Sequence, residues 1–253
     1  MIKSIEDFHL VNSFHLSYLR PLLKWRIMDV KSLMKESEIE SHYHNFYRII
    51  RLLESKKVLE GFRDPYSGKK YVYLSSRGES ALSLKENPTS VSTNTLIHDL
   101  KVSEIGRMFL NNGWVNEVML EHEINDKSIF LSAAKVNPDA LFEGERKGKK
   151  FRIAFELELT RKSKQRIVQK ALYYSESDYY DYILYMFSQK SLVDSYMEII
   201  REKVGLEKMN KFMFFFNPFL TSDKCFDSDP SGYFKGNETS LSTIFATVQM
   251  GSK

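Results

Sequence analysis

The sequence predicts an α/β (α+β) protein with two parts. A small helical part ends in a β-hairpin, and a mixed sheet flanked by helices follows. Along the chain, apolar residues recur with the spacing of helices in the first part and then with a mixture of strand and helix spacing in the second. A polar stretch rich in Ser, Thr and Asn, Lys85–Thr95, separates the two parts. The net charge of +4 lies wholly in residues 1–90, which hold 15 Lys and Arg against 11 Asp and Glu.

The composition bounds the class of protein. The 253 residues, 42% hydrophobic and 28% charged, are enough to bury a core without disulfide staples. The single cysteine, Cys225, excludes a disulfide framework and a cysteine-rich zinc site. No apolar run approaches the ~20 residues of a membrane span, and Met1–Leu10 lacks the apolar stretch of a signal peptide. We therefore expect a cytoplasmic protein with no membrane partner.

Three helices are predicted in the first part. Apolar residues at three- and four-residue spacing predict a helix over residues 5–27, with a kink or break at Pro21. A short helix follows at Asp29–Lys35, and Asp29 is placed to cap it. A third helix is predicted over residues 41–56. Its apolar face consists of Tyr43, Phe46, Ile50 and Leu53.

Another face of this third helix has the chemistry of nucleic-acid recognition. It carries His44, Tyr47, Arg48 and Arg51. Arginine pairs with phosphates or with guanine edges, and tyrosine donates to phosphate. The alternative is a basic helix surface that only contacts solvent.

A hairpin with a basic tip follows the third helix. Strands are predicted over 58–63 and 70–74, around a turn rich in Asp, Pro and Gly, and a further helix over 75–82. The basic residues of the tip are Arg63, Lys69 and Lys70. Three helices and such a hairpin are the order of a winged helix-turn-helix. The segments LLESKKVLE and YVYLSSRG resemble the recognition-helix-to-wing passage of bacterial winged-helix regulators. Double-stranded DNA is the implied partner. The sequence leaves the oligomeric state open, and a homodimer is one alternative because such motifs often bind two-fold symmetric sites.

The second part predicts a mixed sheet with helices on both sides, because hairpins come first and crossovers later. The predicted helices span 96–112, 162–176 and 192–204. The predicted strands span 114–124, 137–142, 151–160, 182–187 and 212–216. Residues 143–150 are expected to form a polar hairpin loop. Residues 217–253 stay unplaced, apart from a strand at 242–248.

Three carboxylates are predicted to converge at one edge of this sheet. Asp139 begins one strand, and Glu156 and Glu158 share a face of the next because side chains alternate. Carboxylates in such a group suit Mg²⁺ or Mn²⁺, which polarises a phosphate and lowers the pKa of an attacking water. Lys162 and Lys164 follow closely enough to neutralise phosphate charge. The alternative is that both glutamates line the solvent-facing side of an antiparallel strand.

The segments Asn137–Ala140 and Phe155–Glu158 resemble the P-D…E-x-E form of the PD-(D/E)XK nuclease superfamily. The phrase ELELTRKSK, with His98-Asp99-Leu100 before it, resembles the plasmid replication-relaxation protein family. That family joins a winged helix to a nuclease-like core. The resemblance implies a DNA-binding domain over 1–86, a linker over 87–95 and a PD-(D/E)XK core over 96–253. The implied activity is metal-dependent nicking or cutting of DNA in the replication or transfer of a mobile element.

The resemblance also implies roles for single residues. Asp139 and Glu156 would bind the metal, while Glu158 stands where the superfamily usually has Lys. Lys164 would supply the missing positive charge, with Lys162 next in line. Because that usual Lys is replaced, the alternative is an inactive core that serves as a DNA-binding regulator or accessory factor.

Four further residues carry weaker predictions. Gln169 and Tyr173 match a Q-x-x-x-Y helix that contacts DNA in one branch of the superfamily. Glu104, with Glu117 as its rival, matches an extra acid of the metal site. Surface charge is the alternative for both glutamates.

The tyrosines between positions 173 and 185 are interpreted as packing residues with hydroxyls at the surface, rather than as a relaxase nucleophile or a base-stacking platform. Nucleotide hydrolysis and dinucleotide binding have no support, because the sequence has neither phosphate-binding glycine motif.

Overall fold

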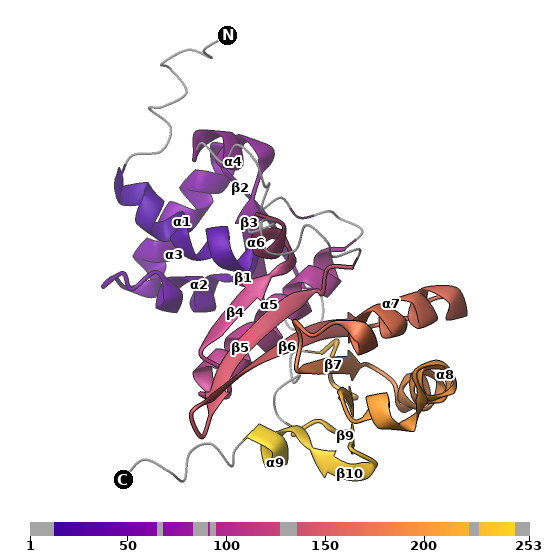
Figure 1. Ribbon diagram of the computed structural model, residues 1–253. Helices are drawn as coiled ribbons and strands as arrows, with labels where there is room; N and C mark the ends of the chain where they lie inside the picture. Colours follow the sequence, from indigo (N-terminus) through magenta and orange to yellow (C-terminus); the bar gives the residue numbers. More distant parts are fainter. Residues whose placement is uncertain are drawn as a thin grey trace. The chain divides into compact units, whose positions relative to one another are not determined.

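The computed structural model describes residues 13–64, 68–82, 91, 95–126, 136–222 and 228–245, with backbone alone at 13–16, 81, 125 and 126. The chain divides into two compact units, Met1–Glu104 and Ile105–Lys253 (Figure 1). The division falls inside helix α5 (Leu96–Asn111). Most of the expected linker, 87–95, lies outside the described residues.

The first unit contains helices and a small antiparallel sheet of order β1-β3-β2. Its elements are α1 (Ser13–Trp25), β1 (Ile27–Asp29), α2 (Val30–Glu36), α3 (Tyr43–Ser55), β2 (Leu59–Arg63), β3 (Lys70–Leu74), α4 (Ser76–Ala81) and the first half of α5. The predicted helices and hairpin are present. The sequence pattern missed β1, because three residues are too few to show a strand period.

Helix α1 runs through Pro21 unbroken, so of the predicted kink or break the break is wrong. Proline removes one helical hydrogen bond, but buried side chains on both sides of it hold the helix in place. Tyr18 precedes the proline, and Leu22 and Trp25 follow it, and all three are buried. The predicted residues 5–12 lie outside the described part.

Side-chain caps set the start of two helices of the first unit. The Asp29 carboxylate accepts hydrogen bonds from the backbone N of Lys31 and of Ser32, each at 3.0 Å, as the sequence predicted for α2. The Ser75 hydroxyl accepts from Gly78 N at 3.0 Å at the start of α4.

The second unit is a mixed α+β fold with a seven-stranded sheet of order β10-β9-β8-β7-β6-β5-β4. Its strands are β4 (Glu117–Leu120), β5 (Ala140–Arg146), β6 (Lys149–Glu158), β7 (Tyr182–Phe187), β8 (Phe212–Phe216), β9 (Ser231–Phe234) and β10 (Asn237–Ser240). The pairs β6–β7 and β7–β8 are parallel and the others antiparallel, so the predicted mixed sheet is confirmed. Among the helices of the described ranges, none has the length and apolarity to cross a membrane.

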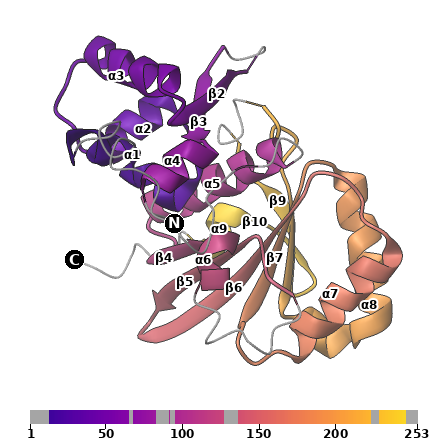
Figure 2. The same ribbon diagram turned by 90° about the horizontal axis from the view of Figure 1, so that it is seen from above.

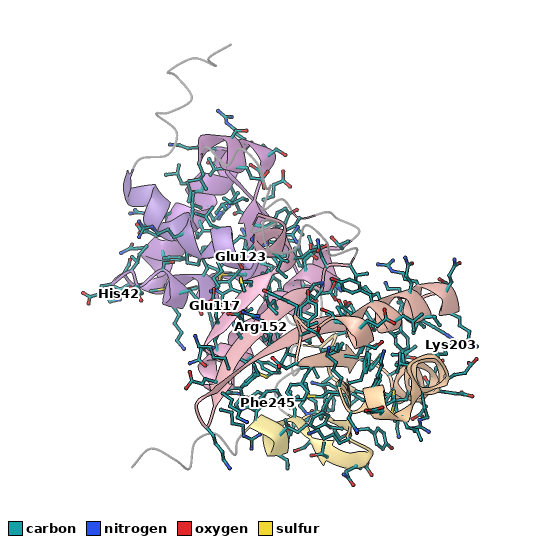
Figure 3. The ribbon with its side chains drawn as sticks, viewed as in Figure 1. His42, Glu117, Glu123, Arg152, Lys203 and Phe245 are labelled. Atoms are coloured by element: carbon teal, nitrogen blue, oxygen red, sulfur yellow. The ribbon has the colours of Figure 1, made fainter. Side chains whose placement is uncertain are left out.

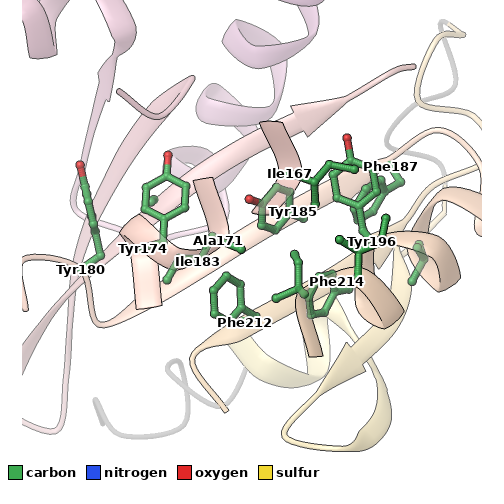
Figure 4. Packing of buried hydrophobic residues seen from close by; sticks show 14 of the residues in the cluster. Ile167, Ala171, Tyr174, Tyr180, Ile183, Tyr185, Phe187, Tyr196, Phe212 and Phe214 are labelled. Carbon is green, nitrogen blue, oxygen red and sulfur yellow. The ribbon is translucent and has the colours of Figure 1, made fainter. Parts of the chain in front are cut away.

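Helices cover both faces of this sheet. Helices α7 (Lys164–Glu176) and α8 (Lys190–Met209) lie side by side along one face, called here the α7–α8 face (Figures 1 and 2). Figure 4 shows their core, in which the rings of Tyr185, Phe212 and Phe214 pack beneath the helices.

The opposite face, called here the α9 face, is covered by the second half of α5 and by α9 (Leu241–Phe245). The Phe109 ring of α5 lies 4.7 Å from Phe142 and 5.2 Å from Phe245, measured between ring centroids. The Phe142 and Phe155 rings stack at 5.0 Å on the adjacent strands β5 and β6.

Three predictions of local structure are wrong. Residues 121–126 form helix α6 (Glu121–Asp126) and do not continue the strand before them. Residues 143–150 are mostly strand, since β5 and β6 are joined by the two-residue turn Lys147-Gly148, both with positive φ. The predicted strand 242–248 is helical to Phe245, because Leu241 and Phe245 bury one helix face, and the rest lies outside the described part.

Replacing Gly232 on β9 by Ala is expected to destabilise the second unit by about 2–4 kcal/mol, because overpacking against backbone forces strand movement. A Cβ at this position would lie 1.9 Å from Phe214 O and 2.7 Å from Phe215 Cα. Urea unfolding measures the loss. The neighbouring exposed change Ser231→Ala is the control and should stay within about 0.5 kcal/mol of the natural protein. Equal stability of the two variants would contradict the close β8–β9 packing.

Candidate functional site

The start of β5 lies beside the end of β6, which brings Asp139 close to Glu156. Asp139 N donates to Phe155 O at 3.0 Å, next to Ala140, which pairs with Phe155. The Asp139 carboxylate accepts from Leu157 N at 2.7 Å, so its side chain is held by the backbone of β6. Strand alternation then places Asp139, Glu156 and Glu158 on the α7–α8 face.

The Glu156 carboxylate is fully buried, with only 1% of its surface exposed. One oxygen accepts from Lys170 Nζ and the other from the Tyr174 hydroxyl, and both donors come from α7. Burial, and next the charge of Asp139, raise the pKa of Glu156 to about 7, while Lys170 and Tyr174 oppose the rise. Glu156 therefore changes its charge near neutral pH.

Glu158 is also buried, at 4% exposure. Burial raises the pKa of its carboxyl, although Lys170, Lys162 and the Tyr196 hydroxyl of α8 stabilise the ionised form. Its Oε2 atom has no hydrogen-bond partner among the described residues. The interpretation of Glu156 and Glu158 as the solvent-facing side of an antiparallel strand is wrong, because α7 and α8 cover this face and β7 is parallel to β6.

The lysine beside the carboxylates is Lys170, and the sequence analysis missed it. Lys164, which was predicted for this role, is exposed at the start of α7 and pairs with Glu202 of α8 at 3.1 Å. Lys162 is half-buried and contributes to the electrostatics of Glu158. The signal that identifies Lys170 is the spacing of Ile167, Lys170, Ala171 and Tyr174 at i, i+3, i+4 and i+7.

The predicted Gln169/Tyr173 pair lies one position away from this inward stripe. Gln169 is exposed and Tyr173 is half-buried, with its ring 5.7 Å from that of Tyr174. The K-x-x-x-Y pair Lys170/Tyr174 faces the carboxylates instead.

The expectation that the tyrosine hydroxyls lie at the surface is wrong for several of them. Tyr174, Tyr180 and Tyr185 are buried. The Tyr174 hydroxyl binds Glu156. Burial raises the pKa of Tyr185 well above its ordinary value, so its hydroxyl stays protonated over Glu156 and Glu158.

The two candidates for an extra acid lie in different units. Glu104 belongs to the first unit and pairs with Lys101 at 2.7 Å. Glu117 is exposed on β4 opposite Glu143 (Figure 3).

The basic residues predicted for DNA binding lie on α3 and the β2–β3 hairpin. His44, Arg48 and Arg51 are exposed on α3, and Tyr47 is half-buried. Phe46, Ile50 and Leu53 form the buried face, whereas Tyr43, predicted to join them, is 44% exposed.

The hairpin contributes Arg63 and Lys69, both exposed. Lys70 binds Glu54 of α3, and its Nζ lies 5.4 Å from the centre of the Tyr47 ring. This contact fixes the hairpin against α3, so Lys70 has a structural role here.

The residues present fit a hard divalent cation in their chemistry. Over the part of the chain that the structure describes, no three His, Cys, Asp or Glu side chains form a ready-made metal cluster. The three carboxylates nevertheless outnumber the ammonium groups of Lys170 and Lys162, which act on them. The unpartnered Oε2 of Glu158 is an oxygen ligand of the kind that Mg²⁺ and Mn²⁺ take.

Comparisons with known proteins do not assign the chain to a family. No protein-family model matches the chain, and no curated protein matches it. Among solved structures, the restriction endonuclease FokI bound to DNA matches with 8% identity and a TM-score of 0.23, over 87% of this chain and 45% of that one. The chain thus spans less than half of the FokI structure, and a likeness at this TM-score supports no argument about fold or activity.

The Glu156→Gln variant is expected to lose the pH dependence that Glu156 gives to folding stability. The folded pKa of about 7 exceeds the ordinary 4.5, so the folded protein binds the proton more tightly and stability falls as pH rises between these values. From pH 5 to pH 8 the natural protein should lose roughly 2–3 kcal/mol more than the variant. Urea unfolding in metal-free buffer at both pH values measures this difference, and parallel losses would contradict the burial of an ionisable Glu156.

Proposed function

We propose that the protein binds double-stranded DNA through a winged helix in its first unit. Its second unit, in this proposal, is a PD-(D/E)XK nuclease-like core that nicks or cuts DNA with Mg²⁺ or Mn²⁺. The observation that carries the proposal is the group of two buried carboxylates, Glu156 and Glu158, with the half-buried Asp139, beside Lys170 on one face of a mixed sheet. Carboxylates with raised pKa values beside a specific lysine are typical of functional sites.

The order of the elements supports the nuclease-like assignment. The sequence α5-β4-β5-β6-α7-β7 contains the predicted core order, with α6 inserted before β5. Strands β4 to β7 are neighbours in the sheet, and the acidic residues lie at β5 and β6. With the ELELTRKSK phrase, this order supports membership of the plasmid replication-relaxation family and action on a mobile element.

Each residue of the site has a distinct part in the proposed reaction. Asp139, Glu156 and Glu158 would hold the divalent ion, which supplies an electrophile for the phosphate and an acidified water. Lys170 holds positive charge within the buried site, where a low dielectric strengthens its attraction for a phosphate. Tyr174 orients Glu156 by hydrogen bonding, and Lys162 adds positive charge beside Glu158.

The second candidate function is a nuclease fold without activity that serves as a DNA-binding regulator. Two observations favour it. Glu158 stands where the superfamily usually has Lys, and both oxygens of Glu156 already accept from Lys170 and Tyr174. Under this proposal, Lys170 neutralises the site permanently in place of a metal ion.

Supercoiled plasmid incubated with the full-length protein and Mg²⁺ or Mn²⁺ is expected to be nicked or linearised. Asp139→Asn should lower the rate at least about 100-fold, because it removes a carboxylate that would hold the divalent ion. Lys170→Met should lower it by a similar factor. Lys164→Met is the matched control and should retain the natural rate, since Lys164 pairs with Glu202 at the surface. No cleavage by the natural protein would favour the second candidate, and cleavage without a divalent metal would contradict the proposed metal-dependent reaction.

The Arg48→Ala/Arg51→Ala variant is expected to bind duplex DNA more weakly because two exposed cations of α3 are lost. Each phosphate contact removed should lower the slope of log affinity against log salt by about 1. Fluorescence anisotropy with a labelled duplex measures both quantities, with Lys69→Ala as a test of the hairpin. Lys203→Ala, on α8, is the control. Unchanged affinity and slope in all α3 and hairpin variants would contradict DNA docking by the first unit.

A further inference from the structure

A cavity of about 480 Å³ lies on the α9 face of the sheet, within the second unit. Its floor includes the half-buried rings of Phe151 on β6, Tyr182 on β7 and Phe234 on β9. The strand registers place these three side chains on one face, and the Tyr182 and Phe234 rings meet edge to face at 5.6 Å. Buried residues Ile153 and Met213 complete the apolar base.

The glycine opposite Phe151 opens room for this floor. Gly144 faces Phe151 across the β5–β6 pair, and a Cβ at Gly144 would lie 2.3 Å from Phe151 Cζ. A larger residue at Gly144 would push the Phe151 ring out of its place.

The rim of the cavity is strongly basic. Its described lining residues include five basic side chains, from Arg146, Lys147, Lys149, Lys150 and Lys235, against one acidic side chain, from Asp181. The four lysines are exposed, whereas the Asp181 carboxylate accepts from Arg152 N at 2.7 Å. The excess of positive charge on the rim therefore favours a ligand with several negative charges.

Two of the rim lysines, Lys147 and Lys235, lie in hairpin turns of the same type. Lys147-Gly148 joins β5 to β6, and Lys235-Gly236 joins β9 to β10. All four residues have positive φ, the geometry of tight two-residue hairpin turns. Two short turns from different parts of the chain therefore carry ammonium groups to one cavity.

This cavity is separate from the carboxylates of the candidate active site. Asp139, Glu156 and Glu158 lie on the α7–α8 face, and the cavity lies on the α9 face. Along β6, Ile153 on the cavity floor is three residues from Glu156, and alternation directs the two side chains to opposite faces of the sheet. The sheet therefore lies between a base in the cavity and the carboxylates.

We propose that this cavity binds a segment of single-stranded DNA. A base stacks on the aromatic floor of Phe151, Tyr182 and Phe234, and phosphates lie on the rim lysines. A basic groove with aromatic side chains is the usual chemistry of single-strand binding, because every base has a face that stacks. Five cations around an aromatic floor match a chain that alternates bases and phosphates. The proposal goes beyond duplex docking by α3, since it concerns a different surface and a different form of DNA.

The test measures binding of a fluorescein-labelled thymidylate octamer to the full-length protein by anisotropy. The natural protein is expected to bind it, and Lys147→Gln/Lys235→Gln should weaken binding about tenfold by removing two phosphate contacts. Phe234→Leu keeps the apolar volume but removes the ring, and a loss of about fivefold or more is expected. Lys203→Gln, an exposed lysine on α8, is the matched control (Figure 3). Thermal unfolding checks that all variants are folded.

The outcomes separate this proposal from the proposed function. Arg48→Ala/Arg51→Ala should lose duplex binding and keep octamer binding, whereas the cavity variants should do the reverse. Octamer binding that is equal in the natural protein and in the cavity variants overturns the proposal, and so does the absence of any octamer binding. Thymidine monophosphate that competes as well as the octamer, at equal concentration, overturns a strand site in favour of a small-molecule site.

Discussion

The second unit depends on one buried interaction, the contact of the Glu156 carboxylate with Lys170 and Tyr174. An ionisable group with 1% exposure needs partners for both oxygens, because an unpaired buried charge costs several kcal/mol. The two donors lie one helical turn apart on α7, so the contact fixes the rotation of that helix over the sheet. The same rotation buries Ile167 and Ala171 in the core beneath α7.

Stability alone does not account for this group of charges. A buried ion pair rarely stabilises a fold more than apolar residues of the same size would. Here three carboxylates share one face, and Asp139 raises the pKa of both glutamates. One oxygen of Glu158 has no hydrogen-bond partner in the part of the chain that the structure describes. A fold that keeps so costly a group needs a reason, and the phosphodiester-handling site that we propose would supply one.

More of the fold than of the candidate site could be predicted from the sequence. Strand alternation alone placed Glu156 and Glu158 on one face, and long periodic segments such as α3, α7 and β7 were predicted close to their observed bounds. Burial of the two glutamates could not be predicted, because it depends on α7 and α8 packing over them. The resemblance points to Lys164, with Lys162 next in line, whereas the rotation of α7 brings Lys170 to the strand.

Short elements escaped prediction for a different reason. Strand β1 and the β9–β10 hairpin have three or four residues each, too few to show a period, and tertiary pairing alone makes them strands. The tight turn at Lys147-Gly148 looked like part of a polar loop, although the exposed residues around it belong to paired strands. As a result, the basic cavity lined by both Lys-Gly turns appears only in three dimensions.

Calorimetric titration of the metal-free protein with Mn²⁺ tests whether Asp139, Glu156 and Glu158 form a metal site. Saturable binding is expected near neutral pH, Asp139→Asn should abolish it, and Lys164→Met should bind like the natural protein. Affinity should rise with pH through the titration of Glu156 near pH 7, because the cation competes with a proton. Absence of Mn²⁺ binding, or equal binding by Asp139→Asn, would contradict the account.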